Sequence, residues 1–212
     1  MPTLQSLPSL PYRLLRQVIV QLPMFRFDRE TRGTQTPATI EHWWSQNIMG
    51  YNRGPYWPVD RSSRVVGWQN ILLGVETSPG LQGGCYIQGI GKIRIGDYTQ
   101  IASNVGIISA NHDLYDNRKH IAEEVVIGRY CWLGMGSVIL PGVKLGDFTI
   151  VGANAVVTKS FVEGHCVLVG SPARKIKELD VSLCVRHRSP FEYHGFIRSD
   201  RFDKFRKANL TL

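Results

Sequence analysis

The side chains with the greatest chemical reactivity gather in one short segment, residues 109–120, which reads SANHDLYDNRKH. His112 is the candidate general base, because a histidine has an ordinary pKa of about 6.5 and its neutral form is plentiful at cytoplasmic pH. Such a base would remove a proton from an acceptor hydroxyl. A histidine of unknown placement can equally be a solvent-exposed loop residue, so residue type alone leaves both interpretations open.

The polar neighbours of His112 offer contacts for a substrate. Asp113 and Asp116 can contact a polyhydroxy acceptor or orient His112, and Tyr115 lies between them. His120 ends the segment; it can contact a substrate, although simple exposure is the favoured interpretation. The segment carries too much charge for a core, so we expect a surface loop.

The four cysteines do not form a recognisable reactive or metal-binding pattern. Cys85, Cys131, Cys166 and Cys184 are widely spaced without a CxxC pair, which fits neither a disulfide framework nor a zinc ribbon. Cys131 is expected to be a small core residue, and Cys85 and Cys166 have no histidine partner visible in the sequence. A covalent acyl-cysteine route is therefore disfavoured.

A six-residue repeat predicts the secondary structure around this segment. An aliphatic residue returns every six positions, and a glycine or alanine usually follows it directly. A second position, four residues after the aliphatic residue, is occupied by a small or β-branched side chain. The aliphatic positions are Ile95, Ile101, Ile107, Ile121, Ile127, Leu133, Ile139, Leu145, Val151 and Val157.

A period of six excludes an α-helix, which turns every 3.6 residues, and favours short strands that each end in a bend. The aliphatic residue is expected to point inward, and the small residue after it to sit at the turn, where it needs room or unusual dihedral angles. Three strands close one triangular coil, and stacked coils bury a continuous column. The sequence therefore predicts an all-β solenoid, a parallel β-helix of hexapeptides.

The repeat is interrupted once, between Ile107 and Ile121. The gap corresponds to one hexad plus an eight-residue insertion, which must project as a loop from a corner of the coil. Since insertions in solenoids tend to gather on the binding face, the loop that carries His112 is the predicted site.

Three segments, IGDYTQIASNVG, IGRYCWLGMGSVILPGVKLGDFTIVGANAVVTKS and VGSPARKIKEL, resemble the hexapeptide-repeat acyltransferases. The similarity covers residues 65–180 and is greatest to O-acetyltransferases of bacterial polysaccharides and to galactoside and maltose acetyltransferases. It implies a left-handed coil, which spacing cannot reveal and which is otherwise rare for parallel crossovers. In this family, a histidine in a matching ANH or ATH segment is the catalytic base, which implies that role for His112.

The same resemblance implies acetyl-CoA as the donor. Trp132 would flank the active site, while Gly134, Ala153, Thr158 and Lys159 would line the donor tunnel. Lys159 and Arg174 are candidate partners for the CoA phosphates, with ordinary surface charge as the alternative. Asp113 stands where sugar acetyltransferases have proline, and Met135 where some relatives have serine, so the acceptor is not carried over.

The implied reaction is direct O-acetylation of a sugar hydroxyl, in surface polysaccharide biosynthesis. Relatives assemble as trimers with active sites between subunits, so a homotrimer is expected, with His112 of one chain facing Trp132 of its neighbour. Two alternatives stay open: a non-catalytic β-helix scaffold and a carbonic-anhydrase-like metal protein. The metal alternative needs three histidine ligands, whereas His112, His120 and His165 do not provide a close pair, so no metal is expected.

The flanks divide the 212 residues into three predicted parts. Residues 1–64 form a partly helical N-terminal extension with a helix within 38–50, and residues 65–170 form the β-helix acyltransferase domain. Residues 171–212 are predicted to form a short helix over SPARKIKELD (171–180), followed by a basic tail. The fold class is thus a β-helix with helical extensions at both ends.

The distribution of charge and the N-terminal sequence indicate which partners and which cellular compartment to expect. The formal charge is +8, of which +4 falls in residues 181–212 rather than on the repeat, so nucleic-acid binding is not expected. No secretory or membrane-spanning pattern is found, which predicts a cytoplasmic protein. Leu14, Leu15, Val18, Ile19 and Leu22 form an amphipathic pattern that can touch a membrane, although packing on the protein's own body is favoured.

Overall fold

Three narrow parallel sheets form the body of the protein in a computed structural model that describes residues 10–211. Sheet A contains β1 (Arg64–Val66), β3 (Tyr86–Gln88), β6 (Gly106–Ile108), β11 (Val138–Ile139) and β14 (Val156–Val157). Sheet B contains β2 (Ile71–Leu73), β4 (Ile93–Ile95), β9 (Val125–Ile127) and β12 (Lys144–Leu145). Sheet C contains β5 (Gln100–Ile101), β10 (Trp132–Leu133), β13 (Thr149–Val151), β15 (Cys166–Val169) and β16 (Arg174–Glu178).

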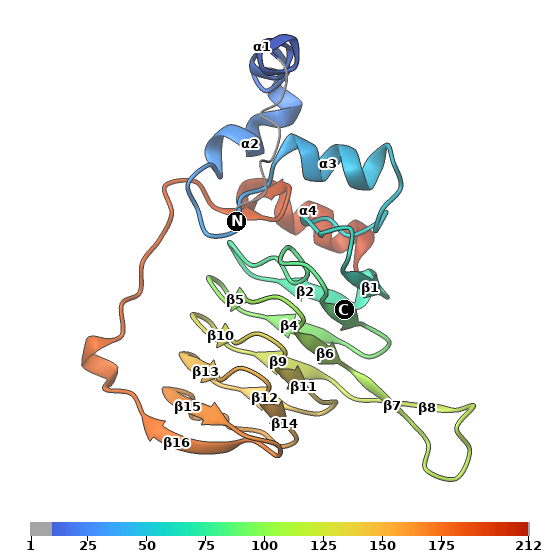
Figure 1. Cartoon of the computed structure of the whole chain (residues 1–212), viewed down its shortest axis with the longest axis vertical. Helices are drawn as coiled ribbons and strands as arrows, with labels where there is room; N and C mark the ends of the chain where they lie inside the picture. The colour runs from blue at the N-terminus through green and yellow to red at the C-terminus, as the bar shows by residue number, and fades with distance from the viewer. Residues whose placement is uncertain (1–9, 212) are drawn as a thin grey trace, which may run out of the picture.

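The chain visits the three sheets in turn, so it winds into a three-sided coil (Figure 1). Trp132 pairs with Ile150 and Val138 pairs with Val156, so one coil takes 18 residues, which is three hexads. All the repeat aliphatics except Ile121 are buried in one continuous core, where none is more than 7% exposed. The parallel pairing and the inward direction of these residues agree with the sequence prediction.

The small residue after each aliphatic provides room rather than an unusual dihedral angle. A Cβ on Gly96 would lie 2.7 Å from the carbonyl carbon of Gly128, and one on Gly128 would lie 2.6 Å from that of Gly146. The left-handed backbone conformation occurs two residues further on, at Tyr98, Tyr130 and the equivalent corners. Of the two predicted reasons for a small residue, the need for room is confirmed, because backbone atoms of the neighbouring coil crowd this position.

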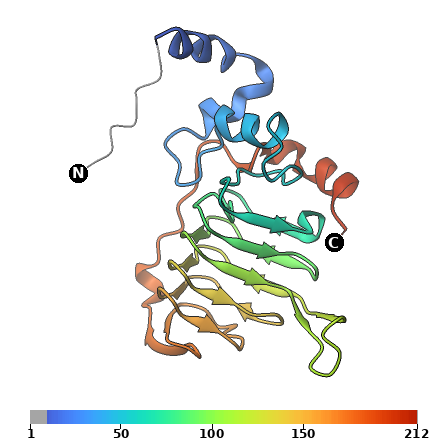
Figure 2. The ribbon, with the colours of Figure 1, turned by 45° about the vertical axis from the view of Figure 1, so that its right-hand side comes forward.

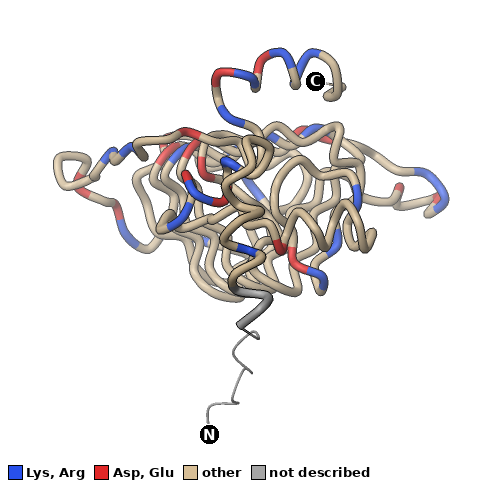
Figure 3. Tube along the Cα trace, turned by 90° about the horizontal axis from the view of Figure 1, so that it is seen from above, with Lys and Arg blue, Asp and Glu red and all other residues tan. Residues whose placement is uncertain are grey.

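The interruption is longer than the sequence suggested. Gly106 pairs with Val138, 32 residues later, so this coil contains 14 residues more than the 18-residue coils that follow it. The excess forms an arm, the hairpin of β7 (Ala110–His112) and β8 (His120–Ala122), which projects from the coil (Figures 1 and 3). Ile121 matches the repeat by residue type but pairs with Asn111 in this hairpin and is 48% exposed. The predicted eight-residue insertion was wrong for this reason.

Short helices cover the N-terminal end of the coil. They are α1 (Leu10–Ile19), the 3-10 turn η1 (Pro23–Phe25), α2 (Arg26–Glu30) and α3 (Ile40–Asn47), with the 3-10 turn η2 (Trp68–Asn70) within the first coil. The buried residues of this end form a second core of Val20, Phe25, Phe27, Ala38, Ile40 and Tyr193. The helix expected within residues 38–50 is confirmed as α3, where Trp43 packs against Phe25 while Trp44 is 53% exposed.

The helix expected over residues 171–180 is absent, because residues 174–178 form the strand β16. This strand pairs antiparallel with β15, whose outer edge would otherwise leave backbone groups unpaired. Ile176 of this strand is 64% exposed.

The chain then returns along one side of the coil to the helical end (Figure 2). It forms η3 (Val181–Leu183), β17 (Tyr193–His194), β18 (Ile197–Arg198) and α4 (Ser199–Asn209). Among residues 10–211, no helix combines the length and the apolar character needed to cross a bilayer.

Candidate active site

His112 stands at the end of β7, directly opposite His120 of β8 in the antiparallel hairpin. Its Nδ1 lies 2.5 Å from the carbonyl oxygen of Asn117. Since a carbonyl oxygen can only accept, Nδ1 must carry the proton in this contact, and neutral His112 has its lone pair on Nε2. The geometry therefore presents Nε2 as the basic atom of an exposed imidazole.

The carboxylates of the arm shape its turn. Asp113 Oδ1 accepts hydrogen bonds from the backbone N–H groups of Tyr115 and Asp116, both at 2.9 Å. Asp116 pairs with Arg118 at 2.8 Å, and this hydrogen bond lowers the pKa of the Asp116 carboxyl. The contacts described for these two carboxylates are with the arm itself, and Tyr115 is 98% exposed at its tip.

Trp132 lies on the outer surface of sheet C, between Gln100 and Ile150 of the neighbouring strands. Its side chain is 55% exposed. A hollow of about 330 Å³ adjoins it, lined by Tyr98, Tyr130, Phe148 and His187, among others. Sequence reasoning missed this hollow, although Tyr98, Tyr130 and Phe148 all occupy the third position after a repeat aliphatic.

The other predicted donor contacts occupy two edges of the coil. Gly134 and Ala153 lie against each other on neighbouring coils, since a Cβ on Gly134 would lie 2.8 Å from the Ala153 nitrogen. Both are at the edge that leads from sheet C to sheet A. Thr158 and Lys159 lie at the edge that leads from sheet A to sheet B, and Arg174 is exposed in β16.

Within one chain, His112 and Trp132 are on different sides of the coil. The arm leaves the edge between sheets A and B, and a three-sided coil places sheet C opposite that edge. Thr158 and Lys159 also lie at the edge between sheets A and B, two coils further along the β-helix than the arm. Within a single chain, the predicted site residues therefore fall into two sets. One set lies on the arm and on the edge between sheets A and B, and the other lies on sheet C and on the edge between sheets C and A.

The three buried cysteines offer no activated nucleophile. Burial raises the pKa of Cys131 to about 12, and the side chain is 2% exposed. Burial also raises the pKa of Cys85 and of Cys166. Since the thiolate is the reactive form, these thiols are inert at neutral pH.

The two histidines of the arm lie close together but are not part of a metal-binding cluster among the described residues. His112 and His120 have ring centroids 4.5 Å apart. Within residues 10–211, no group of three or more histidine, cysteine, aspartate or glutamate side chains is arranged to hold a metal ion.

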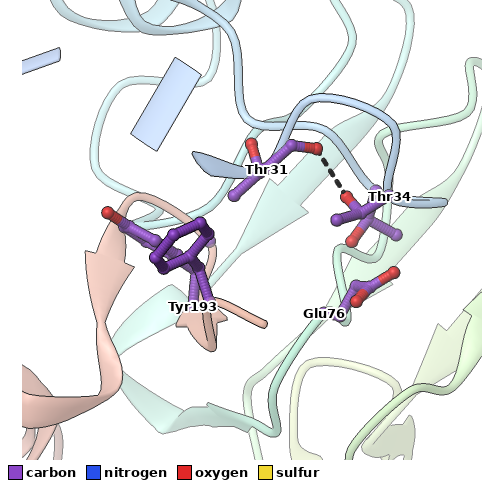
Figure 4. A pocket seen from close by; sticks show the side chains of 7 residues that line it. Thr31, Thr34, Glu76 and Tyr193 are labelled. Atoms are coloured by element: carbon purple, nitrogen blue, oxygen red, sulfur yellow. Dashed lines mark hydrogen bonds between the residues drawn. The ribbon is translucent and has the colours of Figure 1, made fainter. Parts of the chain in front are cut away.

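A small cavity joins the helical end to the first coil (Figure 4). Its volume is about 10 Å³, enough for one water molecule, and Thr31, Thr34, Glu76 and Tyr193 line it. Glu76 accepts a hydrogen bond from the Gln35 N–H at 3.1 Å and another from the Ser189 hydroxyl. The cavity is too small for a substrate, and its carboxylate connects three segments of the chain.

Comparison with known proteins identifies the repeat. Residues 124–159 match the sequence profile of the bacterial transferase hexapeptide (six repeats). This segment is similar to the hexapeptide repeat of bacterial transferases. The hexapeptide coil described above extends from this segment in both directions.

Relatives of the hexapeptide region are acetyltransferases. The chain is 35% identical to the galactoside O-acetyltransferase of Escherichia coli over 92 residues, which are 42% of this chain and 45% of that protein. It is 37% identical over 106 residues to a provisionally named lipopolysaccharide biosynthesis O-acetyl transferase of the same organism, covering 44% of this chain and 54% of that protein. The chain thus spans about half the length of the curated relatives it matches.

The fold extends further than the sequence similarity. A solved structure of a galactoside acetyltransferase in complex with coenzyme A superposes with a TM-score of 0.58, covering 90% of this chain and 92% of that one. The identity is 23%, so this likeness concerns the fold.

Proposed function

We propose that the protein transfers an acetyl group from acetyl-CoA to a hydroxyl group of a sugar, with His112 as the general base. The observation that carries the proposal is the placement of His112 on the arm of the hexapeptide coil, with Nδ1 against the Asn117 carbonyl and Nε2 left as the basic atom. The named relatives are O-acetyltransferases of galactosides and of lipopolysaccharide, and a structural neighbour binds coenzyme A. We further propose the left-handed coil of this family and a role in surface polysaccharide biosynthesis in the cytoplasm.

The proposed reaction is a direct transfer. His112 Nε2 takes the proton of the acceptor hydroxyl while the hydroxyl oxygen attacks the thioester carbonyl carbon. A backbone N–H stabilises the oxyanion that develops, an effect of about 3 kcal/mol in other acyl transfers. The C–S bond then breaks, and His112 returns the proton to the thiolate, which leaves an acetyl ester and free CoA.

We propose that the complete site forms between two copies of the chain, in a homotrimer. The outward residues of sheet A include Tyr86, Gly106, Val138 and Val156, with Arg64 on its first strand, and those of sheet C include Trp132, Ile150 and Val167, with Gln100 and the basic β16 on its two end strands. Sheet B instead shows Leu72, Arg94, Val126 and Lys144. The central strands of sheets A and C thus present apolar surfaces suited to packing, while sheet B carries Arg94 on a central strand and suits solvent.

This assembly accounts for the separation of His112 from Trp132. An arm of one copy would reach sheet C of the next, bringing the imidazole to the tryptophan and the acetyl group. Gly134 and Ala153 at the following edge would contact the pantetheine arm of the donor, with Thr158, Lys159 and Arg174 nearer its phosphates. Asp113, Tyr115, Asp116 and His120 would face the acceptor.

The deciding experiment incubates the protein with acetyl-CoA and a panel of nucleotide sugars and glycans, and follows thiol release and product mass. The expected result is a sugar whose mass increases by one acetyl group, in step with the released thiol. The matched control is His112→Ala, which should release thiol only at the background rate. Thiol release that persists in this variant, or a panel without any acetylated product, would contradict the proposal.

A further inference from the structure

Helix α1 carries an apolar stripe that the body of the protein leaves uncovered. Leu14, Leu15 and Val18 are 56%, 58% and 68% exposed, and the exposed Leu22 and Met24 continue the stripe. Leu14 and Val18 are four residues apart, so they lie on the same side of the helix. The expectation that this pattern packs on the protein's own body was wrong for these residues, and it holds for Ile19, which packs against the core of the helical end.

The stripe faces outward because the other side of α1 is anchored. Arg16 binds Asp28 at 2.7 Å and Glu41 at 2.6 Å. The Asp28 side chain is 1% exposed and also accepts a hydrogen bond from the Ile40 N–H. Val20 is buried in the core of the helical end. These contacts fix the rotation of the helix and direct Leu14 and Val18 away from the body.

A cavity rich in arginine lies on one flank of the stripe. It has a volume of about 420 Å³, and its lining includes Gln21, Met24, Arg26, Arg29, Arg198 and Arg201. Among residues 10–211, two carboxylates pair with these four guanidinium groups: Glu30 lies 3.4 Å from Arg26 and 3.8 Å from Arg198, and Asp200 lies 3.8 Å from Arg198. Within the described part of the chain, Arg201 forms no ion pair. The cavity therefore has an excess of positive charge beside an apolar surface.

An apolar groove lies on the other flank of the stripe, between α1 and α3. Leu15, Ile19, Ile40 and Trp44 line it, and its volume is about 420 Å³. Tryptophan is favoured at the boundary between a membrane and water, since its ring is apolar and its N–H is polar. Helix α1 forms the end of the molecule, and the arm and the far coils lie away from it (Figures 1 and 2).

We propose that this end of the molecule binds an anionic lipid surface. Helix α1 would lie in the headgroup layer with Leu14, Val18 and Leu22 among the acyl chains, while the arginine cavity binds lipid phosphate groups. Charge complementarity favours a lipid over a second copy of the chain, because pairing this surface with itself would bring arginine against arginine. The proposal does not depend on the proposed acetyl transfer.

The test is cosedimentation of the full chain with vesicles. One set contains phosphatidylcholine alone and the other contains about 30% phosphatidylglycerol. We expect binding to the anionic vesicles that exceeds binding to the neutral ones by about tenfold and that weakens in about 0.5 M NaCl. Leu14→Glu and Val18→Glu should each reduce it by about tenfold, and Arg201→Glu should reduce it by at least about fivefold.

The matched controls place the same changes at exposed residues of the returning segment. Leu183→Glu replaces a leucine that is 77% exposed, and Arg188→Glu reverses an exposed arginine. Both should bind vesicles as the wild type does, and unchanged melting temperatures should show that all variants are folded. Equal binding to neutral and anionic vesicles, or no binding to either, would overturn the proposal.

Two further outcomes would also overturn it. If Val18→Glu leaves vesicle binding unchanged but reduces the mass of the assembly in solution, the stripe is an interface between copies. If inorganic phosphate binds the wild type but not Arg201→Glu in calorimetry while vesicles bind neither, the cavity serves a soluble phosphate ligand.

Discussion

His112 and His120 face each other across the β7–β8 hairpin with their ring centroids 4.5 Å apart. The Asn117 carbonyl accepts a hydrogen bond from Nδ1 of His112, and the His120 ring limits the space on one side of the His112 imidazole. The hairpin thereby sets both the tautomer and the orientation of the proposed base. A flexible loop would provide neither.

His112→Ala should abolish acetyl transfer while leaving the fold intact. A general base contributes about 10²–10⁴-fold to kcat, so a loss in that range is expected. His42→Gln, at a histidine of α3 remote from the arm, should keep wild-type kcat. More than about a tenth of the wild-type kcat in His112→Ala would assign the base elsewhere. His120→Ala should cost less than His112→Ala, because the Asn117 carbonyl would still orient His112.

Mixing two inactive variants tests whether the site is shared between chains. His112→Ala and Trp132→Ala each remove one side of the proposed site. After the two proteins are unfolded and refolded together, about a quarter of the interfaces in a random trimer would combine an intact His112 with an intact Trp132. Activity near a quarter of the wild-type value is therefore expected. If the mixture stays as inactive as its components, while its mass shows mixed assembly, both residues act within one chain.

Cys131→Ala should transfer acetyl groups at the wild-type rate. The thiol is buried, and its pKa of about 12 keeps it protonated at neutral pH, so it cannot form an acyl intermediate. The measurement is the initial rate of thiol release, with intact-protein mass spectrometry to search for an acetylated enzyme. An acetyl adduct on wild-type protein that disappears in Cys131→Ala would refute direct transfer.

Gly128→Ala should destabilise the coil. The added Cβ would lie 2.6 Å from backbone atoms of Gly146 and Asp147, which cannot move without disturbing the next coil. A loss of about 1–3 kcal/mol in the free energy of unfolding is expected from urea titration. Gly152→Ala is the comparison, since its nearest neighbour is the Val169 Cγ1 at 2.8 Å, a side-chain atom. It should cost less, and equal losses would show that backbone crowding is not the cause.

The attachment of the C-terminal helix should weaken in mild acid. Burial lowers the pKa of His194, and its hydrogen bond to the Leu73 carbonyl at 2.8 Å only partly offsets this. The unfolded chain then binds a proton more readily than the folded chain, so stability is full above the unfolded value of 6.5 and falls as the pH drops towards the lower folded pKa. His194→Phe keeps the stacking with Phe202 and removes the titrating group. The melting temperature of this variant should fall less than that of the wild type between about pH 7.5 and 5.5, and identical slopes would disprove the assignment.

The sequence by itself determined the six-residue coil, because burial of an aliphatic residue in every hexad is a local requirement that residue types display directly. The sequence also located the arm, since charged residues cannot replace an aliphatic core, whereas the choice of His112 came from the resemblance of its ANH segment to a known family. The length of the arm could not be predicted from the sequence, because Ile121 is an aliphatic residue at a repeat position. Only its strand pairing with Asn111 shows that it belongs to the hairpin. Strand β16 was equally hidden, since its conformation depends on the free edge of β15 rather than on its own residues.

Which residues share a surface follows from the three-dimensional fold. Spacing along the chain shows that His112 and Trp132 are 20 residues apart, whereas the order of the sheets places them on opposite sides of the coil. The direction of α1 was settled in the same way, because Arg16 turns towards a buried carboxylate contributed by α2. Contacts between segments that are distant in the chain determine which side of the molecule a residue faces, and a local pattern of residue types does not predict those contacts.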